Sequence, residues 1–268
     1  MSDEGPYVLK GGLPGKQRLD LLTRLLEPTT ERLLRRAGLV AGMRCLDVGC
    51  GGGGVSRLIA RLVGTEGTVL GLDLDPEKLR LARADTAEEG LHNVRFEQVD
   101  ARQLDEPPVH DLVYARFLVT YLPDPVNAVR RMLRALRPGG ALVVEDIDFS
   151  GHVCHPPSRA FSRYQELFRA AVKQRGGDAD IGPRLPEVLL EAGTADLDVS
   201  LAQPVFLAGE GKGMARLTLQ NLGDTLIAQG LVAREELDAL IAELDTFTRD
   251  QRTLLSLPRV FQVWGRRH

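Results

Sequence analysis

A run of small residues between an apolar stretch and a helical pattern is the clearest chemical feature of this sequence. Residues 45–59 read CLDVGCGGGGVSRLI. Glycines at a strand-to-helix bend let a ligand approach the main chain, and the following helix presents free N–H groups and its positive dipole end. The bend predicts a nucleotide-type pocket. Gly49, Gly51 and Gly54 also satisfy the dinucleotide pattern G-x-G-x-x-G, so the glycines alone leave the nucleotide open.

Three acidic residues at predicted strand ends help to decide which nucleotide the bend binds. Asp47 lies two residues before Gly49, at the end of the first predicted strand, while Asp73 and Asp100 end the second and third. The carboxyl ends of neighbouring parallel strands meet in one crevice, so we expect these acids to lie together there. A dinucleotide site does not explain the third acid.

Apolar strands alternate with amphipathic helices through the first half of the chain. Such alternation predicts right-handed crossovers and a parallel sheet covered on both faces. Before the first strand, two amphipathic helices are predicted, separated at Pro28. From residue 155 the pattern becomes mainly helical. The predicted strands are 43–49, 67–75, 93–100, 110–116, 141–149, 195–207 and 259–266.

These elements predict one α/β domain over residues 1–268, with a doubly wound, mostly parallel seven-stranded sheet in a Rossmann-like arrangement. Its core comprises about residues 39–149 plus the strands near 195–207 and 259–266. Helical cap insertions come from residues 1–37, 150–193 and 210–250.

Composition excludes several classes of protein. The net charge of −3 and the absence of a basic tail argue against a nucleic-acid partner. The acidic, polar first residues do not resemble a signal peptide, and no apolar run is long enough for a membrane span, so we expect no membrane association and a cytoplasmic location. Three cysteines without C-x-x-C spacing favour neither a disulfide framework nor a zinc site, and we expect no metal.

The motifs occur in an order that resembles the class I S-adenosylmethionine-dependent methyltransferases acting on small molecules. LDVGCGGGG resembles the first motif of that family, VLGLDLDPEKL its second-strand acidic motif and VRFEQVDARQL its third motif. HDLVYARFLVTYLPDP resembles the fourth-strand motif, and ALRPGGALVVED the approach to the fifth strand. The matches span roughly residues 43–147. The resemblance implies S-adenosylmethionine as the cofactor.

The resemblance also assigns cofactor-binding roles near the turn. The main chain of Gly49 and Gly51 would accommodate the methionine and ribose portions, with Asp47 beneath them. Asp73 would accept hydrogen bonds from the ribose hydroxyls, which need a paired acceptor. The main chain of Arg116 would meet the methionine amino group.

Other cofactor contacts are expected at the adenine and at the N-terminal arm. By resemblance, Leu74 packs on adenine, while Asp100 and Ala101 read its edge. Tyr7 and Arg18 precede or begin the first helix, where they could close over the cofactor, and Arg18 suits the methionine carboxylate.

The segment after the fifth strand supplies candidate acceptor residues. His152 and His155 lie beyond a carboxyl strand end, where either could act as general base, although His155 precedes two prolines and could instead shape a turn. Phe161, Tyr164 and Phe168 share one helix face, which either packs as core or lines an apolar acceptor pocket.

The sequence therefore predicts an enzyme that transfers a methyl group to a small organic acceptor, with oxygen slightly favoured over nitrogen or carbon. One alternative is a methyltransferase-like protein that binds S-adenosylmethionine without methyl transfer. A less favoured one is an NAD(P)-dependent oxidoreductase. The acceptor is the expected partner, and a homodimer is compatible with the sequence.

Overall fold

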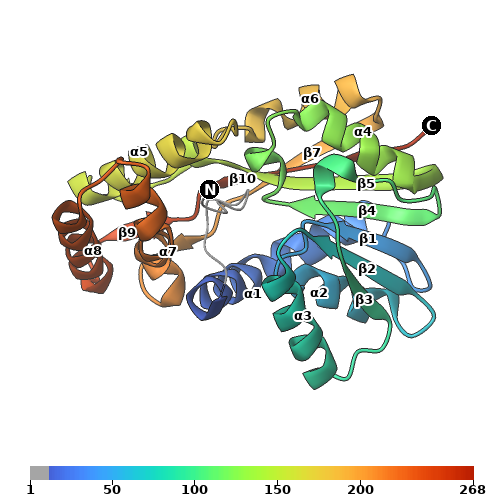
Figure 1. The fold of residues 1–268 in the computed structure, drawn as a ribbon, viewed down its shortest axis with the longest axis horizontal. Helices are drawn as coiled ribbons and strands as arrows, with labels where there is room; N and C mark the ends of the chain where they lie inside the picture. Colours follow the sequence, from blue (N-terminus) through green and yellow to red (C-terminus); the bar gives the residue numbers. More distant parts are fainter. Residues whose placement is uncertain (1–11) are drawn as a thin grey trace.

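The structure is a computed structural model that describes residues 12–268. Its central feature is a seven-stranded sheet in the order β3-β2-β1-β4-β5-β10-β7 (Figure 1). All neighbouring pairs among the first five strands are parallel, while β10 runs antiparallel between β5 and β7. The predicted mostly parallel sheet is confirmed. The strands are β1 (Arg44–Val48), β2 (Thr68–Asp73), β3 (Val94–Gln98), β4 (His110–Arg116), β5 (Leu136–Asp148), β7 (Ala195–Ala202) and β10 (Arg259–Arg266).

Helices cover both faces of the sheet because alternate strand residues are apolar on each side. Leu46 and Val48 pack with α4 and α6 on one face, while Cys45 packs with α1 and α2 on the other. The helices with sheet contacts are α1 (Gly12–Arg36), α2 (Gly54–Val63), α3 (Pro76–Glu88), α4 (Pro125–Ala135) and α6 (Leu185–Ala192).

A second group of helices lies beyond the carboxyl ends of the strands, to the left in Figure 1. It consists of α5 (Arg159–Gln174), α7 (Met214–Ala228) and α8 (Arg234–Arg249), which share an apolar cluster with Phe149. A three-stranded sheet of β6 (Cys154–His155), β9 (Leu254–Ser256) and β8 (Val205–Phe206) accompanies them. The sequence did not predict this small sheet, because its strands are only two or three residues long.

Three predicted boundaries were wrong by more than two residues. The strand predicted over 195–207 ends at Ala202, and Val205–Phe206 form the separate strand β8 of the small sheet. The first helix continues through Pro28 instead of breaking there. Leu26 and Leu33, on either side of Pro28, are both buried, and together they contribute more than the roughly 3 kcal/mol that an internal proline costs. Strand β5 begins at Leu136, five residues before the predicted start at 141. Among the described residues, no helix combines the length and apolar character needed to cross a membrane.

Candidate active site

The glycine-rich turn after β1 is fastened to β2 by main-chain hydrogen bonds. The N–H groups of Gly49 and Cys50 donate to the carbonyl oxygen of Leu72 at 2.7 and 2.8 Å. Gly51 has φ 54°, a conformation that favours glycine, and a Cβ at this position would lie 3.7 Å from Leu19 of α1. The turn and the first residues of α2 line one end of a pocket.

Two buried carboxylates stand at the same end of the pocket. Asp73 accepts the N–H of Gly51 through Oδ2 at 2.8 Å and the N–H of Asp75 through Oδ1 at 2.9 Å. Asp47 accepts the hydroxyl of Ser56 at 2.6 Å. Burial raises the pKa of Asp47 to about 6, against the opposing effects of the Ser56 hydrogen bond and the Arg116 charge. Each Asp73 oxygen can still accept another hydrogen bond.

The third predicted acid, unlike these two, does not line the pocket. Asp100 binds the guanidinium of Arg102 through both oxygens, at 2.6 to 3.0 Å, and the hydrogen bonds from Arg102 lower the pKa of Asp100. Ala101 packs against the sheet core and Leu74 is half-buried. None of Leu74, Asp100 and Ala101 belongs to the pocket lining.

Arg116, at the end of β4, reaches across the pocket wall to α1. Its Nη2 and Nη1 donate to the hydroxyls of Thr23 and Thr30, each at 3.3 Å. Thr30 donates in turn to the fully buried Glu145 of β5 at 2.9 Å, and Tyr114 donates to the same carboxylate oxygen at 2.5 Å. This network fixes α1 over the sheet.

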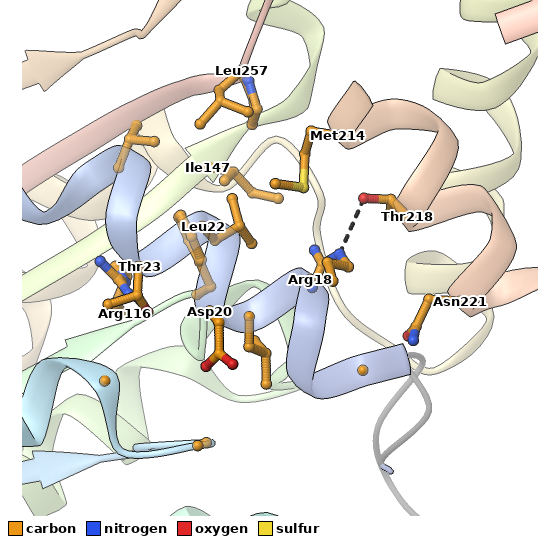
Figure 2. A pocket seen from close by; sticks show the side chains of 18 of the residues that line it. Arg18, Asp20, Leu22, Thr23, Arg116, Ile147, Met214, Thr218, Asn221 and Leu257 are labelled. Carbon is orange, nitrogen blue, oxygen red and sulfur yellow. Dashed lines mark hydrogen bonds between the residues drawn. The ribbon is translucent and has the colours of Figure 1, made fainter. Parts of the chain in front are cut away.

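Arg18 also lies on α1, on the part of the pocket wall that faces the cap. Its Nε donates to the Thr218 hydroxyl of α7 at 3.0 Å (Figure 2). Burial lowers the pKa of Arg18, against the electrostatic effect of Tyr121 and Tyr164. Tyr7, the other residue predicted from the N-terminal arm, lies outside the described residues.

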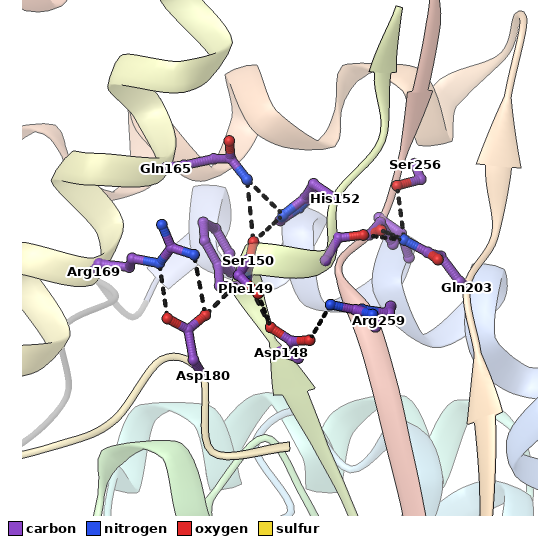
Figure 3. A network of polar contacts seen from close by, with 12 residues as sticks. Asp148, Phe149, Ser150, His152, Gln165, Arg169, Asp180, Gln203, Ser256 and Arg259 are labelled. Carbon is purple, nitrogen blue, oxygen red and sulfur yellow. Dashed lines mark hydrogen bonds and ion pairs between the residues drawn. The ribbon is translucent and has the colours of Figure 1, made fainter. Parts of the chain in front are cut away.

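His152 occupies the opposite, aromatic end of the pocket. Its Nδ1 lies 2.8 Å from the carbonyl oxygen of Phe149, to which Gln165 also donates (Figure 3). Since a carbonyl only accepts, we assign the proton to Nδ1 and leave Nε2 as an acceptor. Burial lowers the pKa of His152 to about 4, so the ring is neutral at pH 7. His155 is exposed on β6 and does not line the pocket.

The predicted aromatic stripe is both core and pocket wall. Phe161, Tyr164 and Phe168 are at most 3% exposed and also line the pocket. Phe149 stacks on Phe168 with ring centroids 3.9 Å apart and meets His152 edge-on at 4.5 Å. The two interpretations of this helix face therefore describe the same side chains.

Comparison with known proteins identifies the family. Residues 39–177 match the family model described as a methyltransferase domain. The trans-aconitate 2-methyltransferase of Methylobacterium radiotolerans is 31% identical over 261 residues, covering 91% of this chain and 95% of that enzyme. The chain belongs to the class I S-adenosylmethionine-dependent methyltransferases. The predicted cofactor is thereby confirmed, and the chain is an enzyme of the methyltransferase type.

Other relatives of this methyltransferase are matched over less of their length. The ubiquinone/menaquinone biosynthesis C-methyltransferase UbiE of Pseudomonas aeruginosa is 34% identical over 154 residues, which are 55% of this chain and 59% of that enzyme. A phosphoethanolamine N-methyltransferase of Haemonchus contortus, solved with phosphomonomethylethanolamine and S-adenosylhomocysteine, has a TM-score of 0.56 and 20% identity. That match covers 90% of this chain and 53% of the other, and it shows the shared fold alone.

Helix α7 contributes pocket residues of this methyltransferase that the sequence interpretation missed. Met214, Thr218 and Asn221 follow one another at i, i+4 and i+7 and all line the pocket. Polar residues on an otherwise buried helix face are the signal that could have revealed them. Thr23 of α1 was missed too, because nothing local marks a threonine as a partner of Arg116.

Proposed function

We propose that this methyltransferase transfers the methyl group of S-adenosylmethionine to a small organic acceptor held between the glycine turn and the aromatic end of the pocket. One observation carries the proposal: a single pocket is lined both by the turn with Asp47 and Asp73 and by the aromatic residues of α5 with His152. Cofactor and acceptor would therefore share one cavity, as direct transfer requires.

The residues at the turn fit the cofactor. Gly51 leaves space where a side chain would project between the turn and Leu19, and both Asp73 oxygens keep acceptor capacity for a ribose diol. We assign Gly49, Gly51, Asp47 and Asp73 to this cofactor end, with the main chain of Arg116 beside it.

The adenine contacts expected from resemblance are less well supported. Asp100 would have to release one of its hydrogen bonds to Arg102 before it could accept the adenine amino group. Leu74 and Ala101 adjoin this strand edge, outside the pocket lining. We retain Leu74, Asp100 and Ala101 as predicted adenine contacts. They depend on Asp100 giving up a hydrogen bond from Arg102 for one from the adenine amino group.

When bound, S-adenosylmethionine supplies a sulfonium methyl group with its own activated leaving group. The chain has to align the acceptor and exclude water. The buried wall of Phe149, Phe161 and Phe168 supports both tasks, because it offers an apolar surface with few competing hydrogen-bonding groups.

An oxygen acceptor agrees best with the charges around the pocket. A protonated amine would be repelled by Arg18, which has no carboxylate partner among residues 12–268. A carbon acceptor needs a base, and His152 is a weak one because burial lowers its pKa to about 4. Its Nε2 can still accept a hydrogen bond from an acceptor hydroxyl. We assign no role in the reaction to His155, which lies away from the pocket.

The test is incubation with methyl-deuterated S-adenosylmethionine and a panel of small acids, phenols and amines, followed by mass analysis. The expected result is one labelled methyl group on an oxygen and equimolar S-adenosylhomocysteine. A product with rearranged bonds and no added methyl group would instead support the alternative of cofactor binding without transfer. Labelled nitrogen or carbon would contradict oxygen as the acceptor atom. The cytoplasmic location and the homodimer stay predictions.

A further inference from the structure

One stretch of the pocket wall carries a positive charge that no carboxylate in the described chain balances. Arg18 of α1 makes one hydrogen bond, from Nε to Thr218, and its Nη1 and Nη2 groups have no partner within residues 12–268. Arg57, by contrast, binds Glu89 at 2.7 Å and lies 3.7 Å from Asp85. An unpaired cation away from bulk water is costly, which points to an anionic ligand.

A second, independent feature lies one helical turn from Thr218. Asn221 of α7 is 4% exposed and lines the pocket, yet neither its Oδ1 nor its Nδ2 has a hydrogen-bond partner among the residues that the structure describes. Buried polar groups are nearly always satisfied in native proteins. Figure 2 shows Asn221 on the same side of α7 as Thr218, near the first turn of α1. Both atoms of the amide are thus available to a ligand.

Two phenols complete this part of the wall. Tyr121 of the 3-10 helix η2 (Val119–Tyr121) and Tyr164 of α5 line the pocket and lie within electrostatic range of Arg18. Burial raises the pKa of Tyr121 to about 12 and that of Tyr164 above its usual value, so both keep their protons and neither neutralises Arg18. We call Arg18, Tyr121, Tyr164, Thr218 and Asn221 the acid recess.

We propose that the acid recess binds a carboxylate of the acceptor, so that the substrate is an organic acid with an apolar body. A guanidinium with free Nη groups matches a planar carboxylate, and the Asn221 amide can donate to an oxygen beside it. The apolar body would lie along Ile147 and Met214, which line the same pocket. This inference rests on the proposed methyl transfer and names the class of its acceptor.

The acceptor is a better occupant than the methionine carboxylate of the cofactor, which was the sequence-based expectation for Arg18. Thr218 and Asn221 belong to α7, which lies beyond the family-wide match that ends at residue 177. A contact shared by all methyltransferases of the family would not depend on this helix. The side chains around Arg18 come from the cap and from η2, not from the glycine turn.

The experiment measures binding to the complex with S-adenosylhomocysteine, using hexanoate, hexyl phosphate, 1-hexanol and hexylamine as probes in calorimetry and ligand-observed NMR. Hexanoate should bind more tightly than the other three. Arg18→Met should weaken hexanoate by about tenfold or more, the least expected from losing a hydrogen bond to a charged group, and leave the affinity for S-adenosylhomocysteine unchanged. Arg24→Met is the matched control, since Arg24 lies on the same helix, pairs with Glu210 and does not line the pocket.

A second substitution keeps the test independent of Arg18. Asn221→Leu should also weaken hexanoate, while the melting temperature stays level or rises because an unsatisfied amide is removed. A fall in melting temperature for both Arg18→Met and Asn221→Leu would show a structural role and overturn the inference. So would weaker S-adenosylhomocysteine binding with unchanged hexanoate binding, or a preference for hexyl phosphate. Failure of the wild-type protein to bind S-adenosylhomocysteine would refute the proposed function itself.

Discussion

Replacing Asp73 by alanine tests the cofactor end most directly. The carboxylate holds the Gly51 N–H at 2.8 Å and the Asp75 N–H at 2.9 Å, and it is the predicted acceptor for the ribose diol. A hydrogen bond to a charged group contributes about 1.5–3 kcal/mol, so Asp73→Ala should weaken S-adenosylhomocysteine binding about 10- to 150-fold. The two N–H groups also lose their acceptor, which should lower the stability of the turn by about 1 kcal/mol or more for each.

The control has to separate ligand contact from turn stability. Asp75→Ala serves, because Asp75 caps α3 by accepting the N–H of Glu77 at 2.9 Å and of Lys78 at 3.2 Å and does not line the pocket. It should lose about 1 kcal/mol of stability and keep cofactor affinity. Calorimetry with S-adenosylhomocysteine and thermal melting give both quantities. Normal affinity in the folded fraction of Asp73→Ala, or an equal loss of affinity in Asp75→Ala, would refute the assignment.

Three further substitutions probe the pocket walls. His152→Gln should gain stability relative to the wild type as the pH falls from 7 to 5. The pKa of His152 is about 4 in the folded protein and about 6.5 in the unfolded chain, so the stability that the neutral ring contributes is present above pH 6.5 and falls by about 2 kcal/mol at pH 5. A difference in melting temperature that does not change with pH would contradict this. Gly54→Ala puts a Cβ 2.6 Å from the Thr23 hydroxyl oxygen and should lower the melting temperature, and added Thr23→Ala should restore much of the loss. Lys212→Met removes the Nζ bonds to the carbonyls of Leu207 and Asp250, at 3.0 and 2.6 Å, and should cost about 2–4 kcal/mol in denaturant unfolding; a smaller loss would mean that water replaces the amine.

The cofactor half of the molecule was predictable because its signals are local. Glycines with positive φ, an acid at the end of β2 and a proline at the start of α3 each act through neighbours in sequence. The sheet order follows from the alternation of strands and helices. The predicted position of Asp73 beside the turn therefore needed no long-range information.

The acceptor half depends on contacts between segments far apart in the chain. Arg18 and Thr218 are 200 residues apart, and Thr30 and Glu145 are separated by 115. No periodicity marks such pairs, and the aromatic face of α5 gives the same pattern whether it packs as core or lines a pocket. Asp100 is a different case. Its strand-end position predicted a ligand contact, but Arg102, two residues away, supplies a local partner that spacing alone does not reveal.

Helix α1 connects the two halves of the site. Its middle is tied to the sheet through Thr30 and Glu145, and its earlier turns lie against Gly51 and carry Arg18 to α7. A shift of α1 would move Leu19, which lies beside Gly51, together with Arg18 of the acid recess, because both residues belong to one rigid helix. Cofactor and acceptor binding should therefore be coupled through this helix. The Glu145 network then matters for positioning even though no atom of Glu145 lines the pocket.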